Sequence, residues 1–375
     1  MKLSIPTSNL LAQLQTVTRV ASTRTAIQAL SGVMISATED SPPELLATDT
    51  EIGLRVPLSA TVEHPGSAVI PARLLHDVVR ALPADQTTLE LRAAEQDIEL
   101  VSGSAIFHLR ILRAEDFPSL PTPIEDTRIT IPAAAFVQTV AQVARSASRD
   151  ETRPVLTGIL MSASAQELRM VATDSYRLSV RQSPLHSPLS GSLEANIPAR
   201  ALQELVRIAQ QDTSAESLSV SLGQNQAIFE LGDVVLSSRL IDGQFPNYRQ
   251  LLPESVEHEL RLSTAELGDV VRRISLLAQR NTPLRLSFRE GELTVSAQTP
   301  DVGEASETIP VPFHGEPFEI GFNPDFLRDG LDSVETDEFV LKLISPLRPG
   351  LIESPGPDSA GGEFLYLIMP IRLNV

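Results

Sequence analysis

The segment Ile70-Pro71-Ala72-Arg73 decides the fold, because it returns 127 positions later as Ile197-Pro198-Ala199-Arg200. Phe322-Asn323-Pro324-Asp325 takes the corresponding place in a third copy. A repeat of this length is a whole domain, since the units of solenoid proteins span only roughly 20–50 residues. The sequence therefore predicts three copies of one domain, at residues 1–125, 126–252 and 253–375.

Further matching segments support the same division. Ile5-Pro6, Ile131-Pro132 and Leu262-Ser263 each open an amphipathic stretch, predicted to be helical as far as residues 21, 147 and 278. The other matches are Ala47-Thr48-Asp49 with Ala172-Thr173-Asp174, and Phe117-Pro118 with Phe245-Pro246 and Met369-Pro370.

Each copy reads as a helix, a group of strands, a second helix and a second group of strands. In the first copy we expect helices at 7–21 and from 71, and strands at 32–37, 45–48, 53–60, 88–91, 98–102 and 106–112. Strands that come in groups between helices favour an α+β fold with antiparallel sheets over strict β-α-β alternation. In the second helix of this copy, the residues expected to face inward are Leu74, Leu75, Val78 and Val79.

Composition excludes several classes of protein. The chain of 375 residues has no cysteine, which excludes disulfides, thiol catalysis and cysteine-based zinc sites. The first residues lack the apolar core of a signal peptide, and no apolar run approaches the roughly 18 residues of a membrane span. We expect a soluble, cytoplasmic protein.

The net charge of −18 argues at first against a nucleic-acid partner, because polyanions repel each other. However, the acidic residues gather at 39–51, 85–99, 290–307 and 332–338, whereas arginines recur on the predicted helices. A GC-rich genome would also explain the scarcity of lysine, and a solvated face with i,i+4 ion pairs would explain each helix taken alone. On four predicted helices, polar side chains share one face: Arg73, Asp77 and Arg80; Gln138, Gln142, Arg145 and Arg149; Arg200, Glu204 and Arg207; and Asp269, Arg273 and Arg280.

No enzyme signature is present. The sequence lacks a P-loop, a G-x-G-x-x-G segment after a strand, a G-x-S-x-G elbow and an H-E-x-x-H helix. The six histidines are scattered, so we expect no metal site, no cofactor and no catalytic residues. Asp174 is the acid that looks most like a site residue, but its repeat partner Asp49 favours a structural role in a turn.

Four segments resemble the bacterial DNA polymerase III beta subunit, the sliding clamp: residues 115–121, 172–178, 241–248 and 366–373. The resemblance covers the full length. It implies a head-to-tail homodimer whose six domains form a ring around duplex DNA, with helices lining the hole and sheets forming the rim. It also implies a non-catalytic processivity factor that serves the replicative polymerase, the clamp loader and repair proteins, near the nucleoid during replication.

The resemblance also implies three sets of site residues. DNA contact is expected at Arg24, Arg73, Arg149 and Arg200, directed at phosphates without base readout. At the dimer interface, Phe107 and Leu109 alternate on the strand at 106–112 and should meet Leu276 and Leu277 of a second subunit. A cleft that binds short linear peptides with apolar anchors is expected from Leu156, Thr173, Ser175, Tyr176, Arg177, Leu178, Pro246, Gln250, Leu251, Asn323, Phe326, Leu347, Met369, Pro370, Ile371 and Arg372.

Three features depart from the family's pattern. Ser175-Tyr176 stands where the family commonly has Gly-His, Gln250 replaces a common arginine, and Asn374 and Val375 extend the C-terminus. A paralogous or specialised clamp with altered peptide binding therefore remains an alternative. Two further alternatives are an enzyme with its site between pseudo-symmetric domains and a peptide-binding scaffold that does not encircle DNA.

Overall fold

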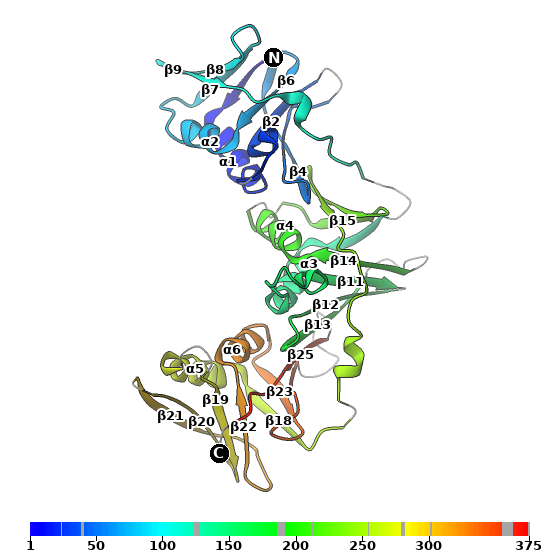
Figure 1. The fold of residues 1–375 in the computed structure, drawn as a ribbon, viewed down its shortest axis with the longest axis vertical. Coiled ribbons are helices and arrows are strands. Elements are labelled where there is room, and N and C mark those ends of the chain that lie inside the picture. The colour runs from blue at the N-terminus through cyan, green and yellow to red at the C-terminus, as the bar shows by residue number, and fades with distance from the viewer. Residues whose placement is uncertain are drawn as a thin grey trace. The chain divides into compact units, whose positions relative to one another are not determined.

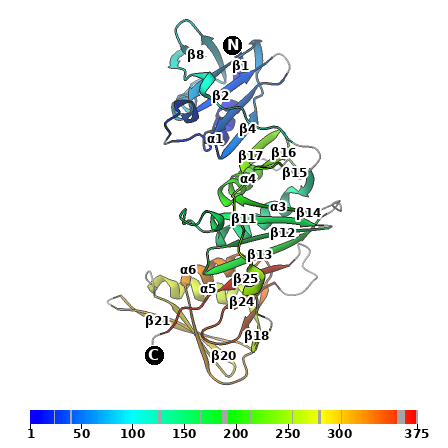
Figure 2. The same ribbon diagram turned by 45° about the vertical axis from the view of Figure 1, so that its right-hand side comes forward.

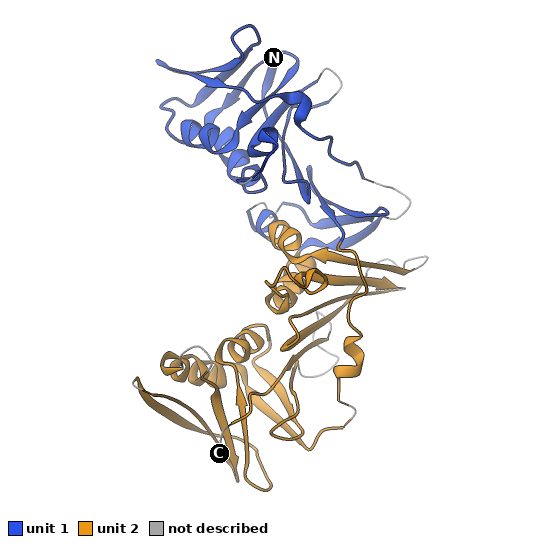
Figure 3. Cartoon of the chain, in the orientation of Figure 1, with its two compact units in different colours: residues 1–133, 207–240 blue, residues 134–206, 241–375 orange. Residues whose placement is uncertain are grey.

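A computed structural model of the chain describes residues 1–23, 25–38, 41–123, 128–164, 166–185, 192–211, 214–253, 255–278, 282–300, 302–354 and 363–373 (Figure 1). The chain forms two compact units, shown in different colours in Figure 3. The first unit holds residues 1–133 and 207–240, and the second holds residues 134–206 and 241–375. The second predicted copy is thus shared between the units.

The first unit contains a five-stranded sheet in the order β5-β1-β7-β8-β9 and an eight-stranded sheet in the order β10-β15-β16-β17-β4-β3-β2-β6. Two helices, α1 (Thr7–Val17) and α2 (Ala72–Arg80), pack against each other in this unit (Figure 1). The strands are β1 (Lys2–Pro6), β2 (Gly32–Ala37), β3 (Glu44–Thr48), β4 (Ile52–Pro57), β5 (Thr61–His64), β6 (Gly66–Pro71), β7 (Gln86–Arg92), β8 (Asp97–Ser102), β9 (Ala105–Arg110), β10 (Ile129–Pro132), β15 (Ser217–Leu222), β16 (Gln226–Leu231) and β17 (Val234–Arg239).

The second unit contains an eight-stranded sheet in the order β14-β11-β12-β13-β25-β24-β23-β18 and a four-stranded sheet in the order β21-β20-β19-β22. Its helices are α3 (Ala133–Val143), α5 (Thr264–Ile274) and α6 (Pro324–Asp332), while α4 (Ala199–Gln211) runs across the division between the units. The strands are β11 (Gly158–Ser164), β12 (Glu167–Thr173), β13 (Arg177–Pro184), β14 (Ser192–Pro198), β18 (His258–Ser263), β19 (Leu284–Arg289), β20 (Glu292–Thr299), β21 (Gly303–Pro310), β22 (Phe318–Phe322), β23 (Glu338–Leu343), β24 (Gly350–Glu353) and β25 (Phe364–Ile368).

The α+β class with antiparallel sheets is confirmed, and the helices start where the repeated segments predict. The third copy begins its helices with side-chain caps: the Ser263 hydroxyl accepts from the Glu266 N–H, and Asn323 Oδ1 accepts from the N–H groups of Asp325 and Phe326. Such caps satisfy backbone donors that have no partner inside the helix. Pro324 then occupies the first turn of α6, where a proline removes no helical hydrogen bond.

The sequence prediction was wrong in three details. The α-helices end at Val17, Val143 and Ile274 rather than at 21, 147 and 278. After the last two helices, the chain continues in 3-10 turns at Ala144–Ser146 and Ser275–Leu277. Leu74 is exposed and Val78 is only half-buried, so the inward face of α2 is narrower than expected. The six short strands that precede the helices, β1, β6, β10, β14, β18 and β22, were not predicted as strands of their own.

The two eight-stranded sheets join neighbouring copies of the repeat. In one, β4 of the first copy pairs with β17 of the second. In the other, β13 of the second copy pairs with β25 of the third, as the neighbouring ribbons in Figure 2 show. The strands that would make a third junction, β9 and β21, each end their sheet in the described part of the chain and pair on one side only.

Candidate functional site

The loop between β12 and β13 is a tight turn held by two side chains. Asp174 Oδ1 accepts backbone hydrogen bonds from Tyr176 at 2.9 Å and Arg177 at 3.0 Å. Thr173 Oγ1 accepts from the Ser175 N–H at 3.2 Å and donates to the Arg177 carbonyl at 2.7 Å. The turn places Ser175 at a φ of 81°, in the left-handed region that favours glycine.

The first copy builds the same turn. Asp49 Oδ1 accepts from the N–H groups of Glu51 at 3.0 Å and Ile52 at 2.8 Å, and Thr48 Oγ1 accepts from the Thr50 N–H at 3.0 Å. Thr50 has a φ of 77°. The predicted structural role of Asp49 and its partner in the second copy is confirmed.

Arg177 connects this turn to α6. Its Nε donates to Asp174 Oδ2 at 3.0 Å, and its Nη1 donates to Asp329 Oδ2 at 2.6 Å. The guanidinium carbon lies 4.4 Å from the centroid of the Phe326 ring, within the range of a cation–π contact. Asp329 also pairs with Arg145, at 3.4 Å. One aspartate thus holds two arginines of the second copy against a helix of the third.

The charge state of this cluster follows from its burial and its partners. Burial by itself would lower the pKa of Arg177, but its neighbours, the carboxylates of Asp329 and Asp174 among them, raise that pKa by more, so the guanidinium stays charged. Burial raises the pKa of Tyr366 well above its usual range. The neutral Tyr366 hydroxyl donates to the Phe326 carbonyl at 2.8 Å, which ties β25 to α6.

An aromatic surface lies above this cluster. The rings of Tyr176 and Phe326 stack with centroids 6.4 Å apart and an interplanar angle of 27°. Tyr176 is 60% exposed, and its carbonyl accepts from the Met369 N–H at 2.9 Å. Exposed aromatic and methionine side chains that adjoin each other form an adaptable apolar contact surface.

A second apolar cluster includes Leu178, which is fully buried beside Leu367, its partner across the β13–β25 pair. Tyr248, in the 3-10 turn Tyr248–Leu251, belongs to the same cluster, and Phe245 packs against it. The segment from Phe245 to Leu252 therefore covers part of the sheet that joins the second and third copies.

The expected cleft residues differ widely in exposure. Contacts join Tyr176, Arg177, Phe326 and Met369, whereas Asn323 caps α6 and the Ile371 N–H bonds to the Gly321 carbonyl at 2.8 Å. Asp329, Arg145 and Tyr366 complete the network, and the sequence did not indicate them as cleft residues. Among the expected residues, Leu156, Thr173 and Leu178 are buried; Arg177, Asn323, Phe326, Pro370 and Ile371 are half-buried; and Ser175, Tyr176, Pro246, Gln250, Leu251, Leu347, Met369 and Arg372 are exposed.

The interpretation of the polar stripe on α3 as a solvated face was wrong. Gln142 is buried, and its Nε2 donates to the Ser333 carbonyl at 2.8 Å. Gln138 donates to Glu335, just beyond α6. Because Arg145 pairs with the acids of α6, this stripe joins the second copy to the third.

The arginines expected to meet DNA have separate positions. Arg73 is exposed in the first turn of α2, Arg149 is exposed after the 3-10 turn Ala144–Ser146, and Arg200 is exposed in the first turn of α4. Arg24 lies outside the described residues, as do Asn374 and Val375.

The two outer sheet edges carry exposed apolar residues. On β9, Ile106 is exposed and Phe107 half-exposed, while Leu109 is only 6% exposed and offers little area to a partner. Near β21, Leu276 is 83% exposed and Leu277 half-exposed. Ile106 was not among the interface residues that the resemblance implies, although its place on an edge strand was a signal.

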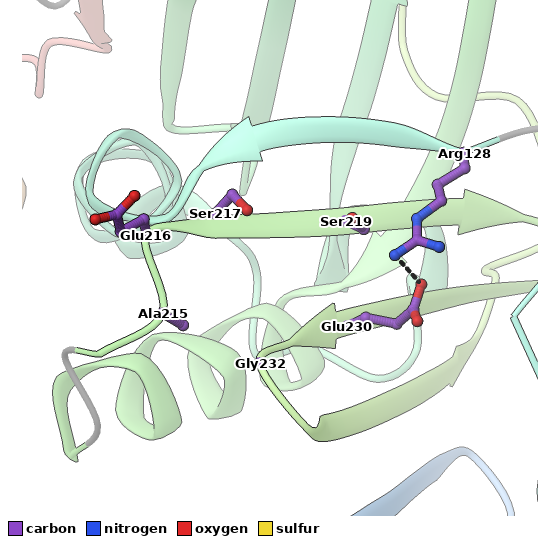
Figure 4. A pocket seen from close by; sticks show the side chains of 7 residues that line it. All are labelled: Arg128, Ala215, Glu216, Ser217, Ser219, Glu230 and Gly232. Atoms are coloured by element: carbon purple, nitrogen blue, oxygen red, sulfur yellow. Dashed lines mark ion pairs between the residues drawn. The ribbon is translucent and has the colours of Figure 1, made fainter.

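A polar hollow in the first unit is a separate feature (Figure 4). It is lined by residues of β15 and β16 and by Arg128, whose Nη2 pairs with Glu230 Oε2 at 3.2 Å. The described residues contain no group of acidic and histidine side chains that could hold a metal ion. Within the same residues, no helix combines the length and apolar character needed to cross a membrane.

Three tandem α+β domains joined edge to edge through their sheets define the architecture of a DNA clamp. Models of the DNA polymerase III beta subunit match the chain in order: its N-terminal domain at residues 1–121, its central domain at 130–247 and its C-terminal domain at 249–372. The chain belongs to this family, the bacterial sliding clamps, which are non-catalytic processivity factors of DNA replication.

Curated relatives and solved structures agree along the whole length. The beta sliding clamp of Streptomyces coelicolor is 33% identical over 354 residues, which is 92% of each chain. That of Bacillus subtilis is 32% identical over 385 residues, covering 99% of this chain and 100% of its own. The crystal structure of the Bacillus subtilis clamp superposes with a TM-score of 0.92 at 30% identity, with 100% of both chains covered.

Proposed function

We propose that two copies of this chain close head to tail into a ring that encircles duplex DNA. The observation that carries the proposal is the pattern of junctions between copies. At both internal junctions, the last strand of one copy's β2–β4 or β11–β13 group pairs with the final strand of the next copy. These pairs are β4 with β17 and β13 with β25. Within the described residues, the equivalent strands β21 and β9 have no such partner, and a second chain supplies one for each.

The internal junctions also predict the register of this contact. Pro310 ends β21 opposite Glu292, as Pro184 ends β13 opposite Glu167, which gives Ala305 the place of Ser179. Ser179 pairs with Tyr366. In the first copy, matching the turn at Asp49 to the turn at Asp174 gives Leu54 the place of Ser179.

Leu54 pairs with Leu236, the third residue of β17, and Phe107 is the third residue of β9 after a hairpin of the same length. Phe107 of one chain therefore lies opposite Ala305 of the other, and Leu109 lies opposite Gly303. A Cβ at Gly303 would be 4.0 Å from Leu277, so this register brings the expected interface leucines together.

Charge supports the same pairing. Strand β9 carries His108 and Arg110, whereas β21 carries Glu304 and also Glu307, which pairs with Arg273 at 2.6 Å. A basic edge that meets an acidic edge favours head-to-tail association over the pairing of two identical edges.

Disulfide trapping tests the register, because the chain has no cysteine of its own. Residues directly opposite on antiparallel strands have Cβ atoms about 4.5–5.5 Å apart, close to disulfide geometry. We expect the double variant Phe107→Cys with Ala305→Cys to form covalent dimers on mild oxidation. The control, Phe107→Cys with Ser306→Cys, is shifted by one residue to the other face and should crosslink weakly. Equal yields, or none with Ala305→Cys, would contradict the register.

In the ring we place duplex DNA against the helices, contacted loosely through phosphates. Arg24, Arg73, Arg149 and Arg200 are the proposed contacts, and the ring holds DNA by topology rather than by base readout. The acidic remainder of the chain, at a net charge of −18, discourages DNA from binding elsewhere. We assign the three domains to residues 1–125, 126–252 and 253–375, and the protein to the cytoplasm.

We further propose that the surface around Tyr176, Phe326 and Met369 is the cleft for short peptide segments of partner proteins. The replicative polymerase, the clamp loader and repair proteins are the partners this family membership favours. Support comes from the stacked aromatic pair of the exposed Tyr176 and the half-buried Phe326, from the neighbouring Met369 and from the turn that holds Tyr176. Direct titration with a peptide that carries leucine and phenylalanine anchors tests the cleft, and no detectable binding would contradict it.

A further inference from the structure

His108 lies on the exposed face of β9, the edge strand of the proposed subunit contact, and this inference rests on that contact. Phe107 and Leu109 point to the opposite face, because side chains alternate along a strand. Glu99 lies opposite His108 on β8 (Figure 1), and its Oε2 is 3.8 Å from the histidine Nε2. The side chain of His108 is still 43% exposed. The single chain therefore sets one carboxylate beside this imidazole and leaves the other side open.

The register proposed for the subunit contact supplies a second carboxylate. Phe107 of one chain lies opposite Ala305 of the other, so the next residue, His108, lies opposite Glu304. Residues directly opposite on antiparallel strands have Cβ atoms about 4.5–5.5 Å apart, within reach of an ion pair between these two side chains. In the closed ring, His108 thus stands between Glu99 of its own chain and Glu304 of the second chain.

Within one chain, the other charges near His108 are those of Asp97 on β8 and Arg92 on β7. Arg92 donates to Asp97 at 2.8 and 2.7 Å and lies 3.9 Å from Glu99. The hydrogen bonds from Arg92 lower the pKa of Asp97, and the charges of His108 and Arg110 lower it further. Because Arg92 already neutralises Asp97, the carboxylate left for His108 in its own chain is that of Glu99.

Across the contact, Arg110 is a second cation that faces Glu304. It follows His108 by two residues on the same face, which places it diagonal to Glu304, and its Nη1 donates to the Glu95 carbonyl at 2.5 Å. The residue that pairs with Glu304 on β20 is the uncharged Gln298. Arginine keeps its charge at every pH of interest, whereas the charge of a histidine ordinarily changes between pH 5 and 8. Of these groups, His108 is the one that titrates near neutral pH.

We propose that His108 makes the subunit contact pH-dependent, because its protonated imidazole bridges Glu99 of one chain and Glu304 of the other. With a neutral imidazole, the two carboxylates face each other across the contact with like charge. With a protonated imidazole, one cation lies between two anions, so the closed ring binds this proton more tightly than the free chain does. Closure is therefore linked to proton uptake, and the contact strengthens as the pH falls from about 8 to about 6.

The test measures the dissociation constant of the full-length dimer by analytical ultracentrifugation at constant ionic strength, at about pH 6 and about pH 8. The wild-type dimer should be about tenfold tighter at the lower pH, from about threefold at each of the two contacts in a ring. His108→Gln is neutral at both pH values and should lose most of this ratio. His108→Arg is charged at both and should form a tight dimer at both.

Two further variants separate the bridge from the general effect of pH on an acidic chain. His314→Gln is the matched control, because His314 is exposed and pairs with Glu290 of its own chain at 2.6 Å, and it should keep the wild-type ratio. Glu304→Gln should lower the ratio as His108→Gln does. The double variant should lower it no further, because the two residues act as a pair.

The outcomes distinguish this assignment from the ring itself. A His108→Gln dimer with the wild-type ratio would overturn the bridge and leave the subunit contact standing, and so would independent, additive effects of His108→Gln and Glu304→Gln. If the wild-type chain stayed monomeric at both pH values, the proposed subunit contact would be contradicted, and this assignment would fall with it.

Discussion

Arg177 donates to Asp329 across 2.6 Å, although 152 positions separate the two residues and they belong to different copies of the repeat. The first copy has Ile52 at the place of Arg177, and Ile52 is buried. The difference extends along the strand, so the junction between the second and third copies is polar where the other junction is apolar. The matched positions are Ser179 and Leu54, Arg181 and Val56, and Ser183 and Leu58.

Glycine at two of the three described non-glycine positions with positive φ should stabilise the chain. Ser175→Gly and Thr50→Gly relieve left-handed backbone at φ of 81° and 77°. We expect a gain of about 1 kcal/mol for each, and more for Thr50→Gly because threonine is β-branched. Urea unfolding measures both. Destabilisation by both variants would show that the hydroxyl groups matter more than the backbone.

The pair of Arg92 and Asp97 should shape stability in acid. Two hydrogen bonds from Arg92, at 2.8 and 2.7 Å, hold the pKa of Asp97 below its usual range. A carboxyl with a lowered native pKa contributes stability that is complete above its unfolded pKa, about 3.9, and is lost as the pH falls through the native value. The thermal unfolding temperature of Asp97→Asn should therefore fall less steeply below about pH 4 than that of the wild type. If the unfolding temperatures of the two chains fell in parallel with pH, the pair of Arg92 and Asp97 would be excluded as a source of the stability lost in acid.

Two leucines should separate assembly from peptide binding. Leu277→Asp places a charge at the proposed subunit contact and should yield monomers by light scattering while the cleft still binds its peptide. Leu347→Asp alters an exposed residue of the expected cleft and should have the reverse effect. A dimeric Leu277→Asp chain would count against this interface.

Reversal of charge at Arg73 and Arg149 should weaken retention on DNA. Each arginine that no longer meets a phosphate should flatten the slope of log affinity against log salt by about one. Arg285→Glu is a suitable control, since Arg285 lies on β19 and pairs with Glu319 at 3.2 Å. An unchanged salt slope in the double variant would reject these arginines as partners of the phosphates.

The sequence predicts the fold well where local patterns decide it. The repeated segments locate the start of all six helices, and Asp49 with Asp174 predicts the two turns. The short strands before the helices were missed because an Ile-Pro pair at a strand end also reads as a helix start. Pro6 and Pro71 do both, ending β1 and β6 with extended backbone that leads directly into α1 and α2.

The network of Arg177, Asp329 and Arg145 could not be predicted, because its members come from distant segments. Gln142 and Arg145 have the helical spacing of a solvated face, and only the packing of α6 turns that face into a buried contact. Asp329 carries no local signal at all. Its role depends on a strand pair, β13 with β25, that the sequence does not specify.

In the proposed function, the chain holds DNA by encircling it. The most direct test follows the protein, loaded by a bacterial clamp loader onto nicked circular DNA, through gel filtration before and after a single cut by a restriction enzyme. We expect the protein to elute with the circular DNA at moderate salt and to be released once the DNA is linear. Equal retention on circular and linear DNA, or none on either, would contradict it.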